Sequence, residues 1–300
     1  AFPFMAVAAR WTRAEAADAS VELAVRVSRD GTGWSRWLDF LEEDEDGRSA
    51  PPEGEHWSRL VIARGRFLQV RIRQVAGQAG AVTLDDLELH YLDADAGPRA
   101  PRTSATVEMA GLGEDVAAAA IEDQIIPRAA WGANEALRFD SAGNEIWPPE
   151  YTEPRAQIVH HTVSANDPVD PAAIMRAILH LHAVTRGWGD IGYNFLIDHR
   201  GNVYEGRFGG ERPGRIVQGG HARQYNTNSI GVALLGTFTE AASRPSAAAE
   251  AALVEVLAAK GVRYGIDPQA PVTLQGTAFA HRIFGHRDAI STACPGQGLY

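Results

Sequence analysis

Two histidines and the only cysteine of the chain have the residue types of a metal site. His160 lies in the run I-V-H-H-T, and His286 and Cys294 lie in the run G-H-R-D-A-I-S-T-A-C-P. Imidazole and thiolate are together the ligands that a borderline-soft cation such as Zn²⁺ selects, and three protein ligands leave a fourth position open to water. The pattern therefore predicts a catalytic zinc site. A lone cysteine is also commonly a small buried apolar residue, and spacing alone leaves that interpretation open.

Longer motifs surround these residues. The runs G-W-G-D-I-G-Y-N-F-L-I-D-H-R-G-N-V-Y-E-G-R (187–207) and G-H-A-R-Q-Y-N-T-N-S-I-G-V-A-L-L-G (220–236) resemble the peptidoglycan recognition protein family. That family belongs with the type-2 N-acetylmuramoyl-L-alanine amidases. The resemblance covers residues 125–300 and begins at I-I-P-R-A-A-W-G-A-N-E. Several motifs agree in the same order, so the likeness is more specific than one short pattern.

The resemblance implies a role for each matching residue. It implies that His160, His286 and Cys294 bind one zinc ion per chain. Tyr193 matches the tyrosine of active amidases, and a phenol beside a cation can donate a hydrogen bond to a developing oxyanion. Thr292 lies where phage relatives have a catalytic lysine, and we expect it to orient water or the carbonyl, which leaves the general acid unidentified. The residues that match the family's peptidoglycan cleft are His161, Thr162, His182, Arg186, His221 and Asn226.

Three functions are open at this point. The favoured one is zinc-dependent hydrolysis of the amide between N-acetylmuramic acid and L-alanine in peptidoglycan. The second is a sensor that binds peptidoglycan or muropeptides without turnover; non-catalytic relatives typically lose the ligand cysteine, so Cys294 favours the enzyme. The third is a Cys–His hydrolase with Cys294 as nucleophile, which thiol alkylation would inactivate and chelators would not. Asp288 either orients His286 or caps a loop.

Composition excludes several classes of partner. The chain has 300 residues, enough for two domains, and its net charge of −10 argues against nucleic acid, whose phosphates require an excess of Lys and Arg. It has no apolar run long enough to span a membrane, and one cysteine cannot form an intramolecular disulfide.

The sequence opens at Ala1 without a leader, so we expect a removed signal peptide or a cut fragment. Because relatives normally continue with another helical stretch, we expect the other end to be clipped as well. The expected location is secreted or in the cell envelope, and the oligomeric state is not predicted.

Residues 1–94 are predicted to form an all-β domain. Apolar residues alternate with polar ones in three runs separated by Gly-, Asp- and Pro-rich turns. This pattern is typical of antiparallel strands with one solvent-exposed face. A β-sandwich or jelly roll is the natural architecture, and it could target the cell wall or a carbohydrate. Trp11, Trp34, Trp37 and Trp57 form either a sugar-stacking platform or, as we favour, core and rim aromatics. The residues predicted to point inward are Val21, Leu23, Val25, Val27, Leu68, Val70, Ile72, Leu87, Leu89 and Tyr91.

Residues 95–124 are a linker by composition, with a short Ala-rich helix near 116–121. Residues 125–300 are predicted to form an α/β domain with a mixed central sheet flanked by helices. The expected elements are strands at 157–161 and 229–235, a hairpin at 193–198 and 202–206, and helices at 171–186 and 246–264. In the first helix Asp170 is the expected N-cap, Pro171 the first residue and Gly187 the end. Helical spacing places Ile174, Ile178, Leu181 and His182 inward, His180 outward and Arg186 at the edge of the inward face.

Overall fold

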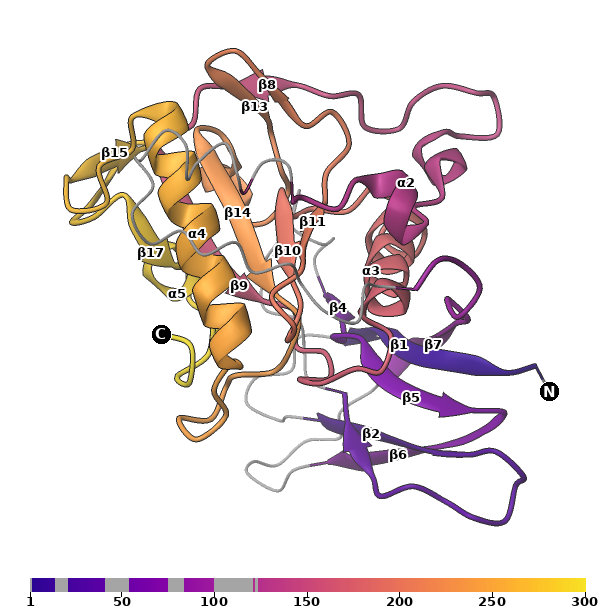
Figure 1. Cartoon of the computed structure of the whole chain (residues 1–300). Helices are drawn as coiled ribbons and strands as arrows, with labels where there is room; N and C mark the ends of the chain where they lie inside the picture. Colours follow the sequence, from indigo (N-terminus) through magenta and orange to yellow (C-terminus); the bar gives the residue numbers. More distant parts are fainter. Residues whose placement is uncertain (1, 14–20, 41–53, 75–83, 100–120, 122–123) are drawn as a thin grey trace. The chain divides into compact units, whose positions relative to one another are not determined.

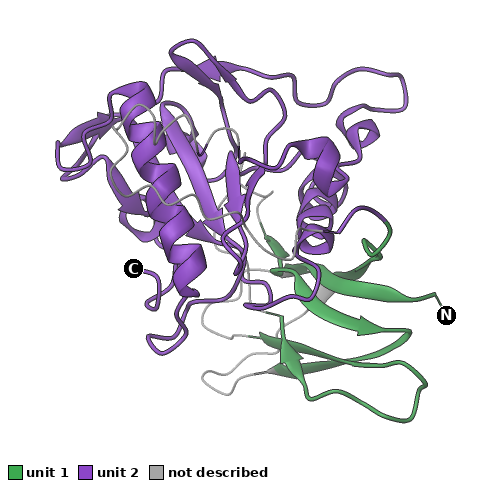
Figure 2. Ribbon diagram, viewed as in Figure 1, with its two compact units in different colours: residues 1–43, 50–96 green, residues 44–49, 97–300 purple. Residues whose placement is uncertain are grey.

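The structure, a computed structural model, describes residues 2–13, 21–40, 54–74, 84–99, 121 and 124–300. The chain divides into two compact units, which Figure 2 colours separately. Unit 1 comprises residues 1–43 and 50–96, and unit 2 comprises residues 44–49 and 97–300. The helix predicted near 116–121 falls, apart from Ile121, outside the described residues, as does most of the predicted linker.

Unit 1 contains two antiparallel sheets. In the first, β1 (Phe4–Arg13) pairs with β4 (Glu55–Trp57), β5 (Val61–Gly65) and β7 (Leu84–Leu92). In the second, β2 (Val21–Ser28) lies between β3 (Leu38–Asp39) and β6 (Phe67–Gln74). Side chains of both sheets share one apolar core, which includes Val7, Trp11, Leu23 and Val25. The described elements of this unit are all strands, as the alternating pattern predicted.

Two predicted inward positions in unit 1 are wrong. Ile72 is 54% exposed, because β6 is an edge strand of a small sheet and fewer side chains cover it there. Tyr91 is 39% exposed and packs its ring against Phe2 and Phe4, with ring centroids 5.8 and 5.6 Å away. Among the tryptophans, Trp11 belongs to the core, which agrees with the interpretation as structural aromatics.

Unit 2 is built on a five-stranded mixed sheet (Figure 1). Its strand order is β11 (Val203–Glu205), β10 (Phe195–Ile197), β14 (Ser229–Leu234), β9 (Ala156–His161) and β17 (Ile283–Gly285). The pairs β10–β14, β14–β9 and β9–β17 are parallel, and only β11 pairs antiparallel within this sheet. The mixed central sheet predicted for this part of the chain is confirmed.

Helices lie beside this sheet. α4 (Ala247–Tyr264) packs Leu253 and Val256 onto sheet residues that include Val159 and Val232. Its N-cap is Ser246, whose hydroxyl accepts the backbone N–H of Ala249 at 3.1 Å. Figure 1 shows the sheet lying between α4 and α3 (Pro171–His180).

The helix predicted at 171–186 is present but changes character along its length. Asp170 occupies the N-cap position without a side-chain capping bond, and Pro171 is the first helical residue. α3 continues as the π-helical turn η2 (Leu181–Thr185), which ends before Gly187. All residues from 171 to 179 are buried, so this part of the helix has no solvent-exposed face. The sequence spacing predicted that only one face would be buried. His182 is buried and His180 is half-buried.

No described helix in the chain is both long and apolar enough to cross a membrane. Several short helices and strands complete unit 2. The short helices are α2 (Arg128–Trp131), η1 (Glu135–Arg138), η3 (Arg223–Asn226) and α5 (His286–Ala289). The short strands are β8 (Tyr151–Thr152), β12 (Glu211–Arg212), β13 (Arg215–Val217), β15 (Val272–Leu274) and β16 (Thr277–Phe279).

Candidate metal centre

Two neighbouring parallel strands end at the same edge of the sheet, and each end carries a histidine. Gly285 on β17 pairs with Val159 on β9, so the next residues, His286 and His160, lie beside each other. Their ring centroids are 4.4 Å apart. The chain then turns through α5 and returns Cys294, whose Sγ lies 3.7 Å from Nδ1 of His160. The three ligand atoms offered by these residues lie within 4.8 Å of one another, and all three residues are buried.

The electrostatics of this cluster suit a cation. Burial, with the neighbouring His286, holds the pKa of His160 well below its usual range, so this imidazole is neutral and keeps a free lone pair. The sulfur of Cys294 accepts the backbone N–H of His161 at 3.4 Å, a bond that holds the side chain beside His160. The hydroxyl of Thr292 accepts the backbone N–H of Cys294 at 3.0 Å and so helps to fix the loop. Two nitrogens and one sulfur gathered in a buried site fit a metal ion.

A second layer of polar groups lies against His160. Its Nε2 is 3.0 Å from Nδ1 of His221, which is fully buried. Burial lowers the pKa of His221 to about 3, so this ring is also neutral. The side-chain oxygen of Asn226 accepts the backbone N–H groups of His221 and Ala222, each at 2.7 Å. The structure buries His221 and Asn226, which the resemblance matched to a peptidoglycan cleft, and places His221 against a candidate metal ligand. Their contact with peptidoglycan stays a prediction.

A row of aromatic rings leads away from the metal cluster. Tyr193 is buried with its ring centroid 5.4 Å from that of His160 and 5.8 Å from that of His182. His182 is followed by Trp188 at 4.8 Å, and the guanidinium of Arg186 lies 4.9 Å from the Trp188 ring. The structure therefore brings together Tyr193, His182 and Arg186, three residues singled out in the sequence, and their catalytic and binding roles stay predictions. Trp188 was missed, although its place between the glycines of G-W-G was a usable signal.

Two features hold this row in place. The ring of His182 projects from the π-helical turn η2, a distortion that is frequent at functional sites, and its Nδ1 accepts the backbone N–H of Gly192 at 3.1 Å. Burial lowers the pKa of His182 to about 4 and that of Arg186 to about 10. At neutral pH the row therefore carries one positive charge, at its Arg186 end.

The two remaining predicted cleft residues are His161, the last residue of β9, and Thr162, which follows it. His161 follows His160 on β9, so it points to the opposite face of the sheet, where its Nδ1 accepts the backbone N–H of Phe238 at 3.1 Å. Thr162 contacts Ser164 through its hydroxyl at 2.9 Å and accepts the backbone N–H of Gly236 at 3.3 Å. Contact of His161 and Thr162 with peptidoglycan stays a prediction.

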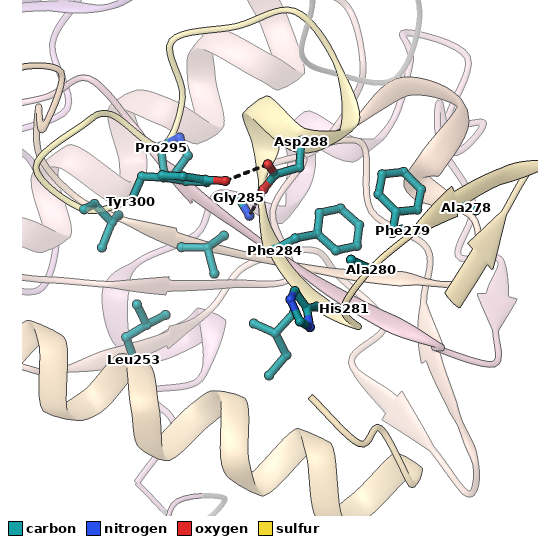
Figure 3. Close-up of a pocket in the computed structure, with 13 residues that line it drawn as sticks. Leu253, Ala278, Phe279, Ala280, His281, Phe284, Gly285, Asp288, Pro295 and Tyr300 are labelled. Atoms are coloured by element: carbon teal, nitrogen blue, oxygen red, sulfur yellow. Dashed lines mark hydrogen bonds between the residues drawn. The ribbon is translucent and has the colours of Figure 1, made fainter. Parts of the chain in front are cut away.

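Asp288 caps the turn that leads from β17 into α5, one of the two roles left open for it. Figure 3 looks into a pocket of about 630 Å³ beside β17 and shows the carboxylate of Asp288 between Gly285 and Tyr300. It accepts the backbone N–H of Gly285 at 2.9 Å and the hydroxyl of Tyr300 at 2.8 Å. These bonds fix the turn from β17 into α5, so Asp288 positions His286 through the backbone.

Comparison with known proteins identifies the family. The family model for N-acetylmuramoyl-L-alanine amidase matches residues 150–297. Peptidoglycan-recognition protein SC2 of Drosophila melanogaster is 31% identical over 59% of this chain and 82% of its own length. An N-acetylmuramoyl-L-alanine amidase of Sus scrofa is 37% identical over 47% of this chain, but the match spans only 21% of that enzyme. This chain therefore belongs to the peptidoglycan recognition protein and type-2 amidase family, which confirms the resemblance of its motifs.

Solved structures of the same family are also similar. Peptidoglycan recognition protein-LE, solved in complex with tracheal cytotoxin, is 28% identical, with a TM-score of 0.46, and the match covers 59% of this chain and 91% of that one. Human PGRP-IBETAC, solved in complex with glycosamyl muramyl pentapeptide, is 27% identical, with a TM-score of 0.46, over 59% of this chain and 92% of that one.

Proposed function

We propose that this protein is a zinc-dependent N-acetylmuramoyl-L-alanine amidase. It hydrolyses the amide between the lactyl group of N-acetylmuramic acid and the L-alanine of the stem peptide. The observation that carries the proposal is the buried cluster of His160, His286 and Cys294 with the Tyr193 ring beside it. Relatives named for peptidoglycan recognition and for this amidase activity support the choice of substrate.

Zinc fits the donor set better than magnesium or calcium. Zinc binds nitrogen at about 2.0–2.1 Å and sulfur at about 2.3 Å in tetrahedral geometry, so neighbouring N and S ligands are about 3.6 Å apart. The separation between Nδ1 of His160 and Sγ of Cys294 is 3.7 Å. Magnesium and calcium prefer oxygen ligands, which none of the three side chains offers. One zinc ion per chain is therefore proposed, held by His160, His286 and Cys294.

The surrounding residues suit hydrolysis of an unactivated amide. When bound, zinc supplies Lewis acidity and brings the pKa of a water molecule close to neutral. Tyr193 lies next to His160, so its phenol can donate a hydrogen bond to the scissile carbonyl oxygen as negative charge develops there. Thr292, whose hydroxyl accepts the N–H of Cys294, is proposed to orient water or the carbonyl. Arg186, at the far end of the row of rings, can bind a stem-peptide carboxylate.

Product analysis with a defined substrate tests the proposal. The zinc-loaded protein is incubated with a muropeptide of known structure, and mass spectrometry identifies the products. We expect free stem peptide and the N-acetylmuramic acid fragment, with activity lost to a chelator and restored by Zn²⁺. Full activity in chelator combined with inactivation by thiol alkylation would instead support Cys294 as a nucleophile. No release of stem peptide by zinc-loaded, folded protein would refute the amidase.

A peptidoglycan sensor is the second candidate function. It is favoured by the names of relatives such as peptidoglycan-recognition protein SC2 of Drosophila melanogaster. A sensor would bind the muropeptide with no turnover, and elemental analysis of the purified protein would find no metal. The amidase requires close to one zinc per chain.

We extend the proposal to the organisation of the chain. Residues 125–300 form the amidase domain, residues 95–124 a linker, and residues 1–94 a β-sandwich that targets the cell wall or a carbohydrate. A secreted or cell-envelope location follows from the proposed substrate. Binding of residues 1–94 to insoluble peptidoglycan in a pull-down is the simplest check of the targeting role.

A further inference from the structure

We propose that a buried hydrogen-bond chain fixes the tautomer of His160 and thereby presents its Nδ1 lone pair to the metal. The chain runs from His160 through His221 and Ser229 to the backbone carbonyl of Tyr225. His221 and Ser229 are therefore positioning residues. The inference rests on the metal site of the proposed function, and it does not depend on which reaction the site performs.

The direction of every bond in the chain follows from its last member. A carbonyl oxygen can only accept, so the Ser229 hydroxyl donates its hydrogen to Tyr225, whose oxygen is 2.5 Å away. Ser229 Oγ then accepts from Nε2 of His221, 3.4 Å away, so that nitrogen carries the proton of the neutral ring. Nδ1 of His221 is left as an acceptor, and its partner at 3.0 Å, Nε2 of His160, must donate.

The consequence at the metal site is specific. A neutral imidazole has one N–H and one lone pair, so a proton on Nε2 of His160 leaves the lone pair on Nδ1. Nδ1 is the atom that faces Cys294 Sγ at 3.7 Å. A metal-binding histidine generally donates its other N–H to a neighbouring group, and this fixes both the ring orientation and the tautomer. In this chain the neighbouring group is a second imidazole.

The backbone around His221 is shaped for its ring. A Cβ atom at Gly231 on β14 would lie 2.4 Å from Cγ of His221, and one at Gly219 would lie 2.8 Å from Cδ2. Both distances are shorter than any normal contact, so the absence of side chains at these glycines makes the space that the ring fills. The bond from the His221 backbone to Asn226 holds the residue in that space. His221 has no exposed surface, so a positioning role suits it better than contact with substrate.

Nuclear magnetic resonance measures the tautomers directly. In full-length protein labelled with ¹⁵N-histidine, long-range proton–nitrogen spectra identify which ring nitrogen carries the proton. We expect His160 and His221 to be protonated on Nε2 in the metal-free protein, and the same state to persist when zinc is added. A proton on Nδ1 of His160 in the metal-free protein would overturn the inference. This result is independent of amidase activity, so it separates failure of the inference from failure of the proposed function.

Zinc affinity provides the second test, measured by competition with a chromogenic chelator. His221→Ala removes the acceptor for His160, and loss of such a partner typically weakens metal binding by about 10–100-fold. His221→Asn restores an acceptor oxygen close to the Nδ1 position and is expected to recover most of the affinity. Equal affinities for the wild type and both variants, each shown to be folded by circular dichroism, would overturn the inference.

A matched pair of serines distinguishes positioning from general stability. Ser229→Ala removes the acceptor for His221 and is expected to weaken zinc binding and to mix the tautomers of His221. Ser58→Ala removes a buried serine of unit 1 that accepts the backbone N–H of Ala9 at 2.7 Å. It should leave zinc affinity unchanged, and a similar loss in both variants would contradict the positioning role of Ser229.

Discussion

Replacing Asp190 by Asn should destabilise unit 2 strongly without touching the metal cluster. The carboxylate of Asp190 is 1% exposed and lies 2.6 Å from Arg207 and 3.1 Å from Arg128. Both guanidinium groups are buried as well, and the same carboxylate accepts the backbone N–H groups of Ile191 and Phe208 at 2.8 Å. Asn keeps the size of the side chain but removes its negative charge. Two buried cations then lose their shared counter-charge.

The magnitude follows from burial. Removing one partner of a buried ion pair typically costs about 3–5 kcal/mol, because the remaining charge stays out of water. For a domain of this size, 1 kcal/mol lowers the melting temperature by roughly 2–4 °C, so we expect a decrease of roughly 6–20 °C. Differential scanning calorimetry is the suitable assay, because two compact units can unfold in separate transitions.

An exposed ion pair of the same unit is the control. Glu153 lies 3.3 Å from Arg215, and their side chains are 71% and 55% exposed. Glu153→Gln should change stability by about 1 kcal/mol or less, since water screens exposed pairs. If Asp190→Asn also stayed within about 1 kcal/mol, the reasoning that buried charge drives the effect would be refuted.

Four further outcomes are expected. Gly231→Ala forces a methyl group against His221, so it should lower stability by about 1–3 kcal/mol and weaken zinc binding, whereas Gly33→Ala, with only 3.8 Å contacts, should do neither. Tyr193→Phe should reduce kcat by roughly 10²–10³-fold with little change in muropeptide affinity, measured by product mass spectrometry and calorimetric binding. Cys294→Ser should lose zinc in elemental analysis, and full zinc retention would exclude this residue as a ligand. Because burial lowers the pKa of His182 to about 4, the unfolded chain binds more protons at this residue below pH 6.5, which contributes a fall in stability of roughly 1.4 kcal/mol per pH unit from 6.5 to 4. The buried His160 and His221, whose pKa values are also lowered, add to this fall, so His182→Asn should make the slope in denaturant titrations shallower by the contribution of one histidine.

The elements that were predictable are those with a regular local pattern. The apolar run before His160 and the punctuated segment that starts at Pro171 each predicted an element that the structure contains. β1 was missed as a strand, because its buried run F-M-A-V-A-A has no alternation to show a period of two. β17 was missed for a different reason: it has three residues, too few for any period.

The part of the site that depends on long-range packing could not be predicted from the sequence. The motifs selected His160, His286 and Cys294, but only the parallel pairing of β9 with β17 explains how they meet. His221 was assigned by resemblance to a cleft, because a motif gives the residue type without its burial. The ion pairs of Asp190 could not be predicted either, because Arg128 and Arg207 are distant from it in the sequence and ion pairing produces no periodic sequence pattern.

The joining of β17 to β9 also makes an ion in this site a non-covalent cross-link. The sulfur and imidazole that approach each other at 3.7 Å belong to residues 134 positions apart in the chain. Two of the three ligands sit beyond an edge strand of three residues, which by itself holds its place with few backbone bonds. Closing so long a loop removes conformations from the unfolded chain. Metal binding would therefore stabilise the attachment of the last segment to the rest of unit 2. Protease digestion near the carboxyl-terminal segment should accordingly slow when zinc is present.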